Sequence, residues 1–188
     1  MAIDLRDDLL KIESTTEQAL IKDRRHLHQR PELSFNEEHT ADYIASFLDR
    51  LPVQNLKMGV GGHGVVADVQ GKRPGRSVLV RADMDGLPLT EDVDVPYRST
   101  NPGVMHACGH DVHMAIALAL ADNLAVNQDR LPGLVRFAFQ PAEEKAGGAK
   151  PMIEAGVLDG IDRVIGLHVW SQLPVGQICV RPGPIMAS

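Results

Sequence analysis

The hydrophobic pattern at the start of the chain predicts two amphipathic helices. Between residues 5 and 30, apolar positions recur among charged ones at helical spacing, and the pattern stops before Pro31. A second stretch, 36–51, again gathers its apolar residues on one face of a helix. The residues expected to face inward there are Ala41, Ile44, Ala45, Phe47 and Leu48.

The pattern then changes to short apolar runs bounded by glycine or proline, which indicate β-strands. The predicted strands are 64–71, 77–85, 134–140, 164–170 and 176–182. Between the second and third of these lies an alanine- and leucine-rich segment, 111–127, whose apolar residues cover most of the helical circumference. We therefore expect a helix there, buried against a sheet. A further short helix is expected at 148–154.

This alternation of strands and helices predicts the α/β class, with a mostly parallel sheet flanked by helices. In open sheets of this kind, ligands bind outside the carboxyl ends of the strands. Polar side chains follow several of the predicted strands, so we expect a site at that edge. They are Asp83, Asp85, Glu143, Glu144, His168 and the segment HACGHDVH at 106–113.

Composition and charge exclude several classes of function. The net charge of −6 and the aromatic fraction of 4% leave neither a basic surface nor a stacking platform for nucleic acid. The longest uncharged apolar run, 114–121, is far shorter than the ~20 residues of a membrane-spanning helix. The N-terminus reaches acidic residues by Asp4, which does not match a secretory signal. We expect a cytoplasmic protein that binds neither nucleic acid nor membranes.

The segment 106–113 carries the pattern most typical of metal binding. Cys108 and His110 are two residues apart, and a thiolate and an imidazole are good ligands for zinc and other first-row metals. A structural histidine-rich loop is the alternative. His113 then forms only the polar edge of a helix, while Asp111 either caps that helix or orients an imidazole.

The other polar residues at the strand ends also allow two interpretations. Glu143 and Glu144 form either a solvated surface or a working pair, in which one carboxylate binds metal and the other accepts a proton from metal-bound water. His168 is either a core histidine or a further ligand. Asp83 either caps a turn or fixes a ligating imidazole.

Three further residues are expected to be structural. His26 and His28 fall on different sides of the first helix, so they do not form a pair of ligands. Cys179 alternates within the predicted strand 176–182 and is expected to be buried and unreactive.

Six segments, in this order, resemble the hippurate-hydrolase branch of the aminoacylase/carboxypeptidase amidohydrolases. They are RRHLHQRPELSFNEEHTADYI, RADMDGLP, MHACGHDVHMA, QPAEE, GGAKPMIEAGVLD and GLHVW. The resemblance runs from about Asp23 to Ser188. It implies that residues 1–188 are the N-terminal part of a metallopeptidase catalytic domain, without the family's lid and dimerisation domain.

The resemblance further implies hydrolysis of the amide bond of N-acyl amino acids such as hippurate, with two divalent ions (zinc, manganese, cobalt or nickel). In the family pattern, the position of Cys108 bridges both ions. The positions of His110 and His168 complete one ion, and that of Glu144 binds the other. The position of Glu143 is the general base for the bridging water, and that of Asp83 orients the metal-binding side chains.

Family members are much longer than 188 residues, and the part beyond this chain supplies a histidine for the second ion. For this chain alone we therefore expect one ion and little or no activity. The alternatives are a non-catalytic fragment that binds one metal, or half of a split enzyme completed by a C-terminal partner chain. A homo-oligomer is the other partner considered. A cysteine hydrolase with Cys108 paired to His110 or His106 is another, although it leaves the glutamates and His168 without a role.

Overall fold

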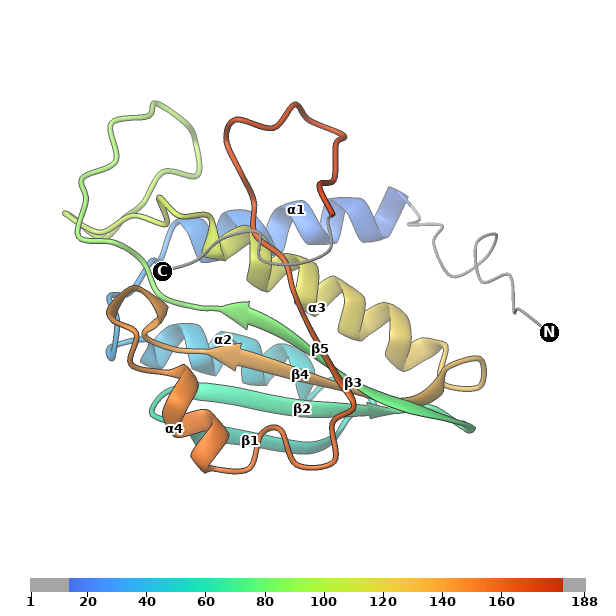
Figure 1. Cartoon of the computed structure of the whole chain (residues 1–188). Coiled ribbons are helices and arrows are strands. Elements are labelled where there is room, and N and C mark those ends of the chain that lie inside the picture. Colours follow the sequence, from blue (N-terminus) through green and yellow to red (C-terminus); the bar gives the residue numbers. More distant parts are fainter. Residues whose placement is uncertain (1–13, 181–188) are drawn as a thin grey trace.

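The computed structural model describes residues 14–180, in which helices lie against a twisted sheet (Figure 1). The helices are α1 (Ser14–His28), α2 (Glu38–Leu48), α3 (His110–Val126) and α4 (Ala149–Glu154), with a 3-10 turn, η1 (Glu143–Lys145). The strands are β1 (Gln54–Val60), β2 (Gly64–Gln70), β3 (Arg73–Asp83), β4 (Pro132–Gln140) and β5 (Arg163–Gly166). The predicted helices are confirmed within a few residues, except that positions 5–13 lie outside the described residues.

The strands form one sheet in the order β1-β2-β4-β3-β5. β3 runs parallel to both β4 and β5, whereas β2 runs antiparallel to β1 and β4. The α/β class is thus confirmed, and the sheet is mixed: parallel pairing holds for β4, β3 and β5, whereas the predicted strand 64–71, which contains β2, is antiparallel to both of its neighbours. A turn at 61–63, with Gly61 and Gly62 at φ 67° and 113°, sends the chain back antiparallel after β1. β1 was not predicted, because its side chains are mostly exposed and form no apolar run.

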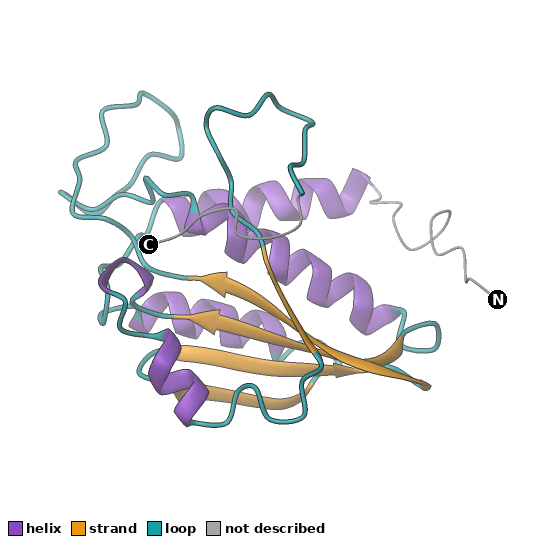
Figure 2. Cartoon of the chain, viewed as in Figure 1, coloured by secondary structure: helices purple, strands orange, loops and turns teal. Residues whose placement is uncertain are grey.

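Helices cover both faces of the sheet (Figure 2). On one face, α2 and α3 pack on the strands and α1 packs on α3. The main core lies there, and its fully buried side chains include Phe137, Phe139, Val65, Leu118 and Ile44. On the other face, α4 contributes Met152 to a smaller cluster with Val66, Leu79 and Ala138.

Two predictions about the C-terminal region are wrong. The run 176–182 forms no strand over its described part, 176–180, where Ile178 and Val180 are 89% and 86% exposed. Cys179 is exposed instead of buried. An alternating apolar pattern does not form a strand by itself, because a strand needs a neighbouring strand for its backbone hydrogen bonds. This segment pairs with no strand among the described residues. The run 164–170 is a strand only through Gly166, after which the chain leaves the sheet.

Within residues 14–180, no helix combines the length and the apolar character needed to cross a membrane.

Candidate metal centre

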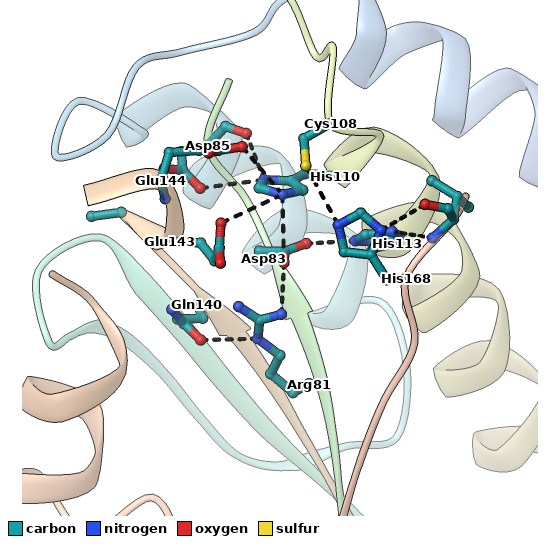
Figure 3. A network of polar contacts seen from close by, with 12 residues as sticks. Arg81, Asp83, Asp85, Cys108, His110, His113, Gln140, Glu143, Glu144 and His168 are labelled. Atoms are coloured by element: carbon teal, nitrogen blue, oxygen red, sulfur yellow. Dashed lines mark hydrogen bonds and ion pairs between the residues drawn. The ribbon is translucent and has the colours of Figure 1, made fainter. Parts of the chain in front are cut away.

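The side chains predicted from the strand ends come together at one edge of the sheet (Figure 3). Three overlapping groups each place their donor atoms within 4.8 Å of one another, and His110 belongs to all three. The groups are Cys108 with His110 and His168, His110 with Glu143 and Glu144, and Asp83 with His110 and His113. They are carried by the end of β3, η1, the turn before α3, the start of α3 and the segment after β5.

His110 is the first residue of α3 and is fully buried. Gly109 precedes it in the left-handed conformation (φ 87°), which glycine adopts without strain. The His110 Nδ1–H donates to the backbone carbonyl of Asp85 at 2.8 Å. The opposite nitrogen, Nε2, is buried without a hydrogen-bond partner among the described residues, 3.8 Å from Glu144 Oε1 and 3.9 Å from Glu143 Oε2.

His168 approaches Cys108 from the segment that follows β5. Its Nδ1–H donates to the carbonyl of Val169 at 2.6 Å, and its Nε2 lies 3.4 Å from the Cys108 Sγ. His168 and His110 therefore share one arrangement: a carbonyl holds Nδ1, and Nε2 faces the centre. This is how metal-binding histidines are usually oriented, because a hydrogen bond at one ring nitrogen directs the other.

The glutamate pair lies on η1, between Ala142 and Ala146, which are both in the left-handed conformation at φ 49°. The Glu144 amide donates to Asp85 Oδ2 at 3.0 Å, which ties this turn to the end of β3. The Glu143 side chain is 39% exposed and that of Glu144 is 21% exposed. Glu143 is therefore the more open to solvent of the two neighbours.

Asp83 contacts His113 more closely than His110. Its Oδ1 accepts the His113 Nδ1–H at 2.6 Å, whereas its Oδ2 lies 3.5 Å from His110 Nε2. The other nitrogen of His113, Nε2, accepts the backbone amide of Val169 at 3.0 Å. Both nitrogens of His113 are thus engaged, which sets this imidazole apart from those of His110 and His168.

The charges at the centre suit a cation. Burial raises the pKa of Cys108, and the neighbouring carboxylates, Glu144 first, raise it further to about 12. Burial works to raise the pKa of Asp83 as well, but the hydrogen bond from His113 and the nearby cationic groups bring it down to about 2. Carboxylates beside a thiol oppose the thiolate that a cysteine nucleophile requires. They favour a divalent ion instead.

The donors present fit such an ion. One thiol, two imidazole Nε2 atoms and carboxylate oxygens are the ligands that zinc and related metals take. The unpartnered, buried Nε2 of His110 is an independent sign, because buried polar atoms are normally satisfied.

Sequence reasoning did not assign roles to three residues that build this edge. Asp85 holds both His110 and Glu144, and its spacing of two from Asp83 was the available signal. His113 was interpreted only as the polar edge of a helix, and only in the structural alternative, whereas it is 2% exposed. Glu37 accepts the amide of Ala142, and nothing in its local sequence indicates that contact. His106, a neighbour of the cluster in sequence, is buried outside the three groups.

The chain is similar in sequence to known proteins over most of its length. Residues 79–184 match the family model "Peptidase family M20/M25/M40". The chain is 44% identical over 184 residues to N-acyl-L-amino acid amidohydrolase of Geobacillus stearothermophilus, covering 97% of this chain and 50% of that protein. It is 46% identical over 187 residues to thermostable carboxypeptidase 1 of Saccharolobus solfataricus, covering 98% and 46%.

Among solved structures, a dinuclear metal-binding peptidase of the M20 family from Bacillus subtilis aligns with a TM-score of 0.87. The two are 41% identical, and the alignment covers 92% of this chain and 48% of that one. The chain spans about half the length of the relatives it matches. This chain belongs to the peptidase family M20/M25/M40.

Proposed function

We propose that this chain carries the metal-binding part of an amidohydrolase that cleaves the amide bond of N-acyl amino acids, hippurate-like substrates included. Residues 1–188 are then the N-terminal part of its catalytic domain. The observation that carries the proposal is the convergence of Cys108 Sγ, His110 Nε2 and His168 Nε2, with both histidines held at Nδ1. Relatives named as an N-acyl-L-amino acid amidohydrolase and an N-acetyl-L-cysteine deacetylase support the reaction class.

In this proposal, Cys108, His110 and His168 hold one divalent ion, and Cys108 and Glu144 contribute to a second. Zinc, manganese, cobalt and nickel all suit these donors. When bound, the ions polarise the scissile carbonyl and lower the pKa of the attacking water. A remaining ligand for the second ion comes from outside the described residues or from a second chain.

The protein groups supply positioning and proton transfer. Glu143, the more exposed of the two glutamates, accepts the proton of the attacking water on its carboxylate and passes it to the leaving amine. Asp85 holds His110 and the glutamate turn together, so the general base keeps its place relative to the metal donors. Asp83 holds the His113 ring beside His168 by accepting its Nδ1–H. The acidic composition supports a small-molecule substrate over nucleic-acid binding. A cytoplasmic location is part of the same proposal.

The first test is the metal content of the purified chain, measured by elemental analysis without added chelator. We expect one ion per folded chain, lost in Cys108→Ala and retained in Cys179→Ala, a matched control because Cys179 is exposed and lies outside the three donor groups. No ion in the folded chain, or an ion that survives Cys108→Ala, would overturn the proposed centre.

The second test is hydrolysis of N-acetyl and N-benzoyl amino acids after metal loading. We expect little or no turnover by this chain alone, because in this proposal the residues of 14–180 bring only Cys108 and Glu144 to the second ion. Turnover that appears when the remainder of a full-length family member is supplied, and that needs Glu143, would support the hydrolase. Metal binding with no turnover in either case would favour the non-catalytic alternative.

A further inference from the structure

Val169 contacts the start of α3 at two points and also binds the ring of its own neighbour, His168. Its amide donates to His113 Nε2 at 3.0 Å, and its carbonyl accepts the His168 Nδ1–H at 2.6 Å. Its side chain covers Gly109, where a Cβ atom would come within 2.4 Å of Val169 Cγ2. Val169 therefore packs on Gly109, the residue between Cys108 and His110. Its carbonyl also fixes the ring of the neighbouring His168.

His113 is prepared for this contact from the opposite side. Its Nδ1–H donates to Asp83, and the same carboxylate accepts a hydrogen bond from Arg81 at 2.6 Å. Arg81 is held in turn by Gln140, at 2.9 Å (Figure 3). Since an ionised carboxylate only accepts hydrogen bonds, Asp83 keeps the proton of a neutral His113 on Nδ1. The lone pair on Nε2 is then free to receive the Val169 amide.

The segment that carries His168 has little else to hold it. β5 ends at Gly166, and His168 and Val169 are outside the sheet and exposed, with Val169 at 36%. The contacts of Val169, together with an edge-to-face contact between the His113 and His168 rings at a centroid distance of 4.8 Å, therefore set where His168 stands relative to Cys108.

We propose that His113 is a positioning residue that places His168 for metal binding, by way of the Val169 amide. This inference rests on the proposed metal centre. It adds a chain of hydrogen bonds that connects Asp83 to His168 through His113 and Val169. It assigns His113 no place among the ligands, because both of its ring nitrogens are already engaged.

The test is a Co²⁺ titration of the metal-free chain, followed by the cobalt–thiolate absorption in the near ultraviolet and the weaker visible bands. The variants are His113→Phe, His168→Ala and the double variant. We expect His113→Phe to weaken Co²⁺ binding by about 10–100-fold, as loss of a residue that orients a ligand typically does. Its visible spectrum should resemble that of His168→Ala. The double variant should bind no more weakly than His168→Ala alone, because the two side chains act through one contact.

Each other result has a distinct meaning. If His168→Ala binds Co²⁺ like the wild type, the proposed centre is wrong. If His168→Ala is weakened and His113→Phe is not, the centre stands and the role of His113 is refuted. Additive losses in the double variant also refute it, since His113 would then act independently of His168.

Two further variants separate positioning from a general loss of stability. His113→Asn keeps an amide that can donate to Asp83 but is too short to reach Val169, so it should bind Co²⁺ as weakly as His113→Phe. If His113→Phe does not fold, the Co²⁺ affinity of His113→Asn alone tests the role of His113. Leu118→Val, on the core side of the same helix, should lower the melting temperature and leave Co²⁺ affinity within about twofold.

Discussion

The carboxylate of Glu37 accepts a hydrogen bond from the backbone amide of Ala142, 105 residues further along the chain, at 2.6 Å. Glu37 is fully buried just before α2, and Ala142 is a non-glycine residue in the left-handed conformation immediately before Glu143. Such a conformation costs roughly 1–2 kcal/mol and persists only where surrounding contacts hold it. The Glu37 contact thus connects the start of the chain to the turn that presents the glutamate pair.

We expect Glu37→Ala and Glu37→Gln to have different effects on stability. Alanine leaves the Ala142 amide buried without an acceptor, which costs about 1–3 kcal/mol. Burial raises the pKa of Glu37, so its contribution to stability is greatest below the ordinary pKa and is lost as the pH rises through the raised value. At pH 7.5, glutamine keeps an acceptor without that penalty and should match or exceed the wild type. Thermal unfolding of both variants checks this, and equal losses would contradict it.

A buried histidine outside the metal centre gives the stability a predictable pH dependence. His28 Nδ1 lies 2.8 Å from Asp111 and its Nε2 lies 3.0 Å from Glu91, while Arg24 also contacts Asp111. The hydrogen bond with Asp111 raises the pKa of His28 above 6.5; burial opposes this, and Glu91 adds to the increase. The stabilisation is therefore complete below pH 6.5 and is lost as the pH rises through the raised pKa.

The variant His28→Gln should accordingly lose more stability at pH 6 than at pH 9. The loss at pH 6 should be of the order of 3–5 kcal/mol, as for a buried ion pair that loses one partner. Chemical denaturation across this range measures the difference. A loss of the same size at both pH values would show that the pKa of His28 is not raised in the folded protein.

Metal should protect one cysteine from alkylation and leave the other unchanged. Cys108 belongs to the donor group with His110 and His168, whereas Cys179 is exposed on the C-terminal segment. With Zn²⁺ bound, iodoacetamide should modify Cys179 at the rate seen in metal-free protein and Cys108 at least tenfold more slowly. Peptide mass spectrometry separates the two sites. Equal rates at Cys108 with and without Zn²⁺ would contradict its role as a ligand and revive the cysteine-hydrolase alternative.

The outer edge of the sheet should promote self-association. β5 is an edge strand, and Val164 and Ile165 are 57% and 54% exposed on it. Exposed apolar edges pair readily with other chains, and a lysine there opposes pairing. Ile165→Lys should therefore reduce light scattering at high protein concentration. Val126→Lys is the matched control, because Val126 is 73% exposed but lies at the end of α3, and it should change scattering less.

Local patterns in the sequence were enough to predict the α/β class, α2, α3 and α4, and the edge of the sheet where the polar residues gather. Helical spacing and short apolar runs bounded by glycine or proline arise from the backbone within a few residues, so they can be recognised without the fold. The expectation that Asp83, Cys108, His110, Glu143, Glu144 and His168 lie near one another followed from their places after strands and before a helix, and the family resemblance pointed to the same positions.

Only the tertiary structure decided which strands pair and what each side chain contacts. The antiparallel placement of β2 beside β4 and the absence of a strand at 176–180 depend on hydrogen-bonding neighbours far away in the sequence. Likewise, the contact of His113 with Val169 joins residues 56 positions apart. A periodic pattern tells which face of an element is buried, but the partner of a buried polar atom is set by segments that meet only when the chain folds.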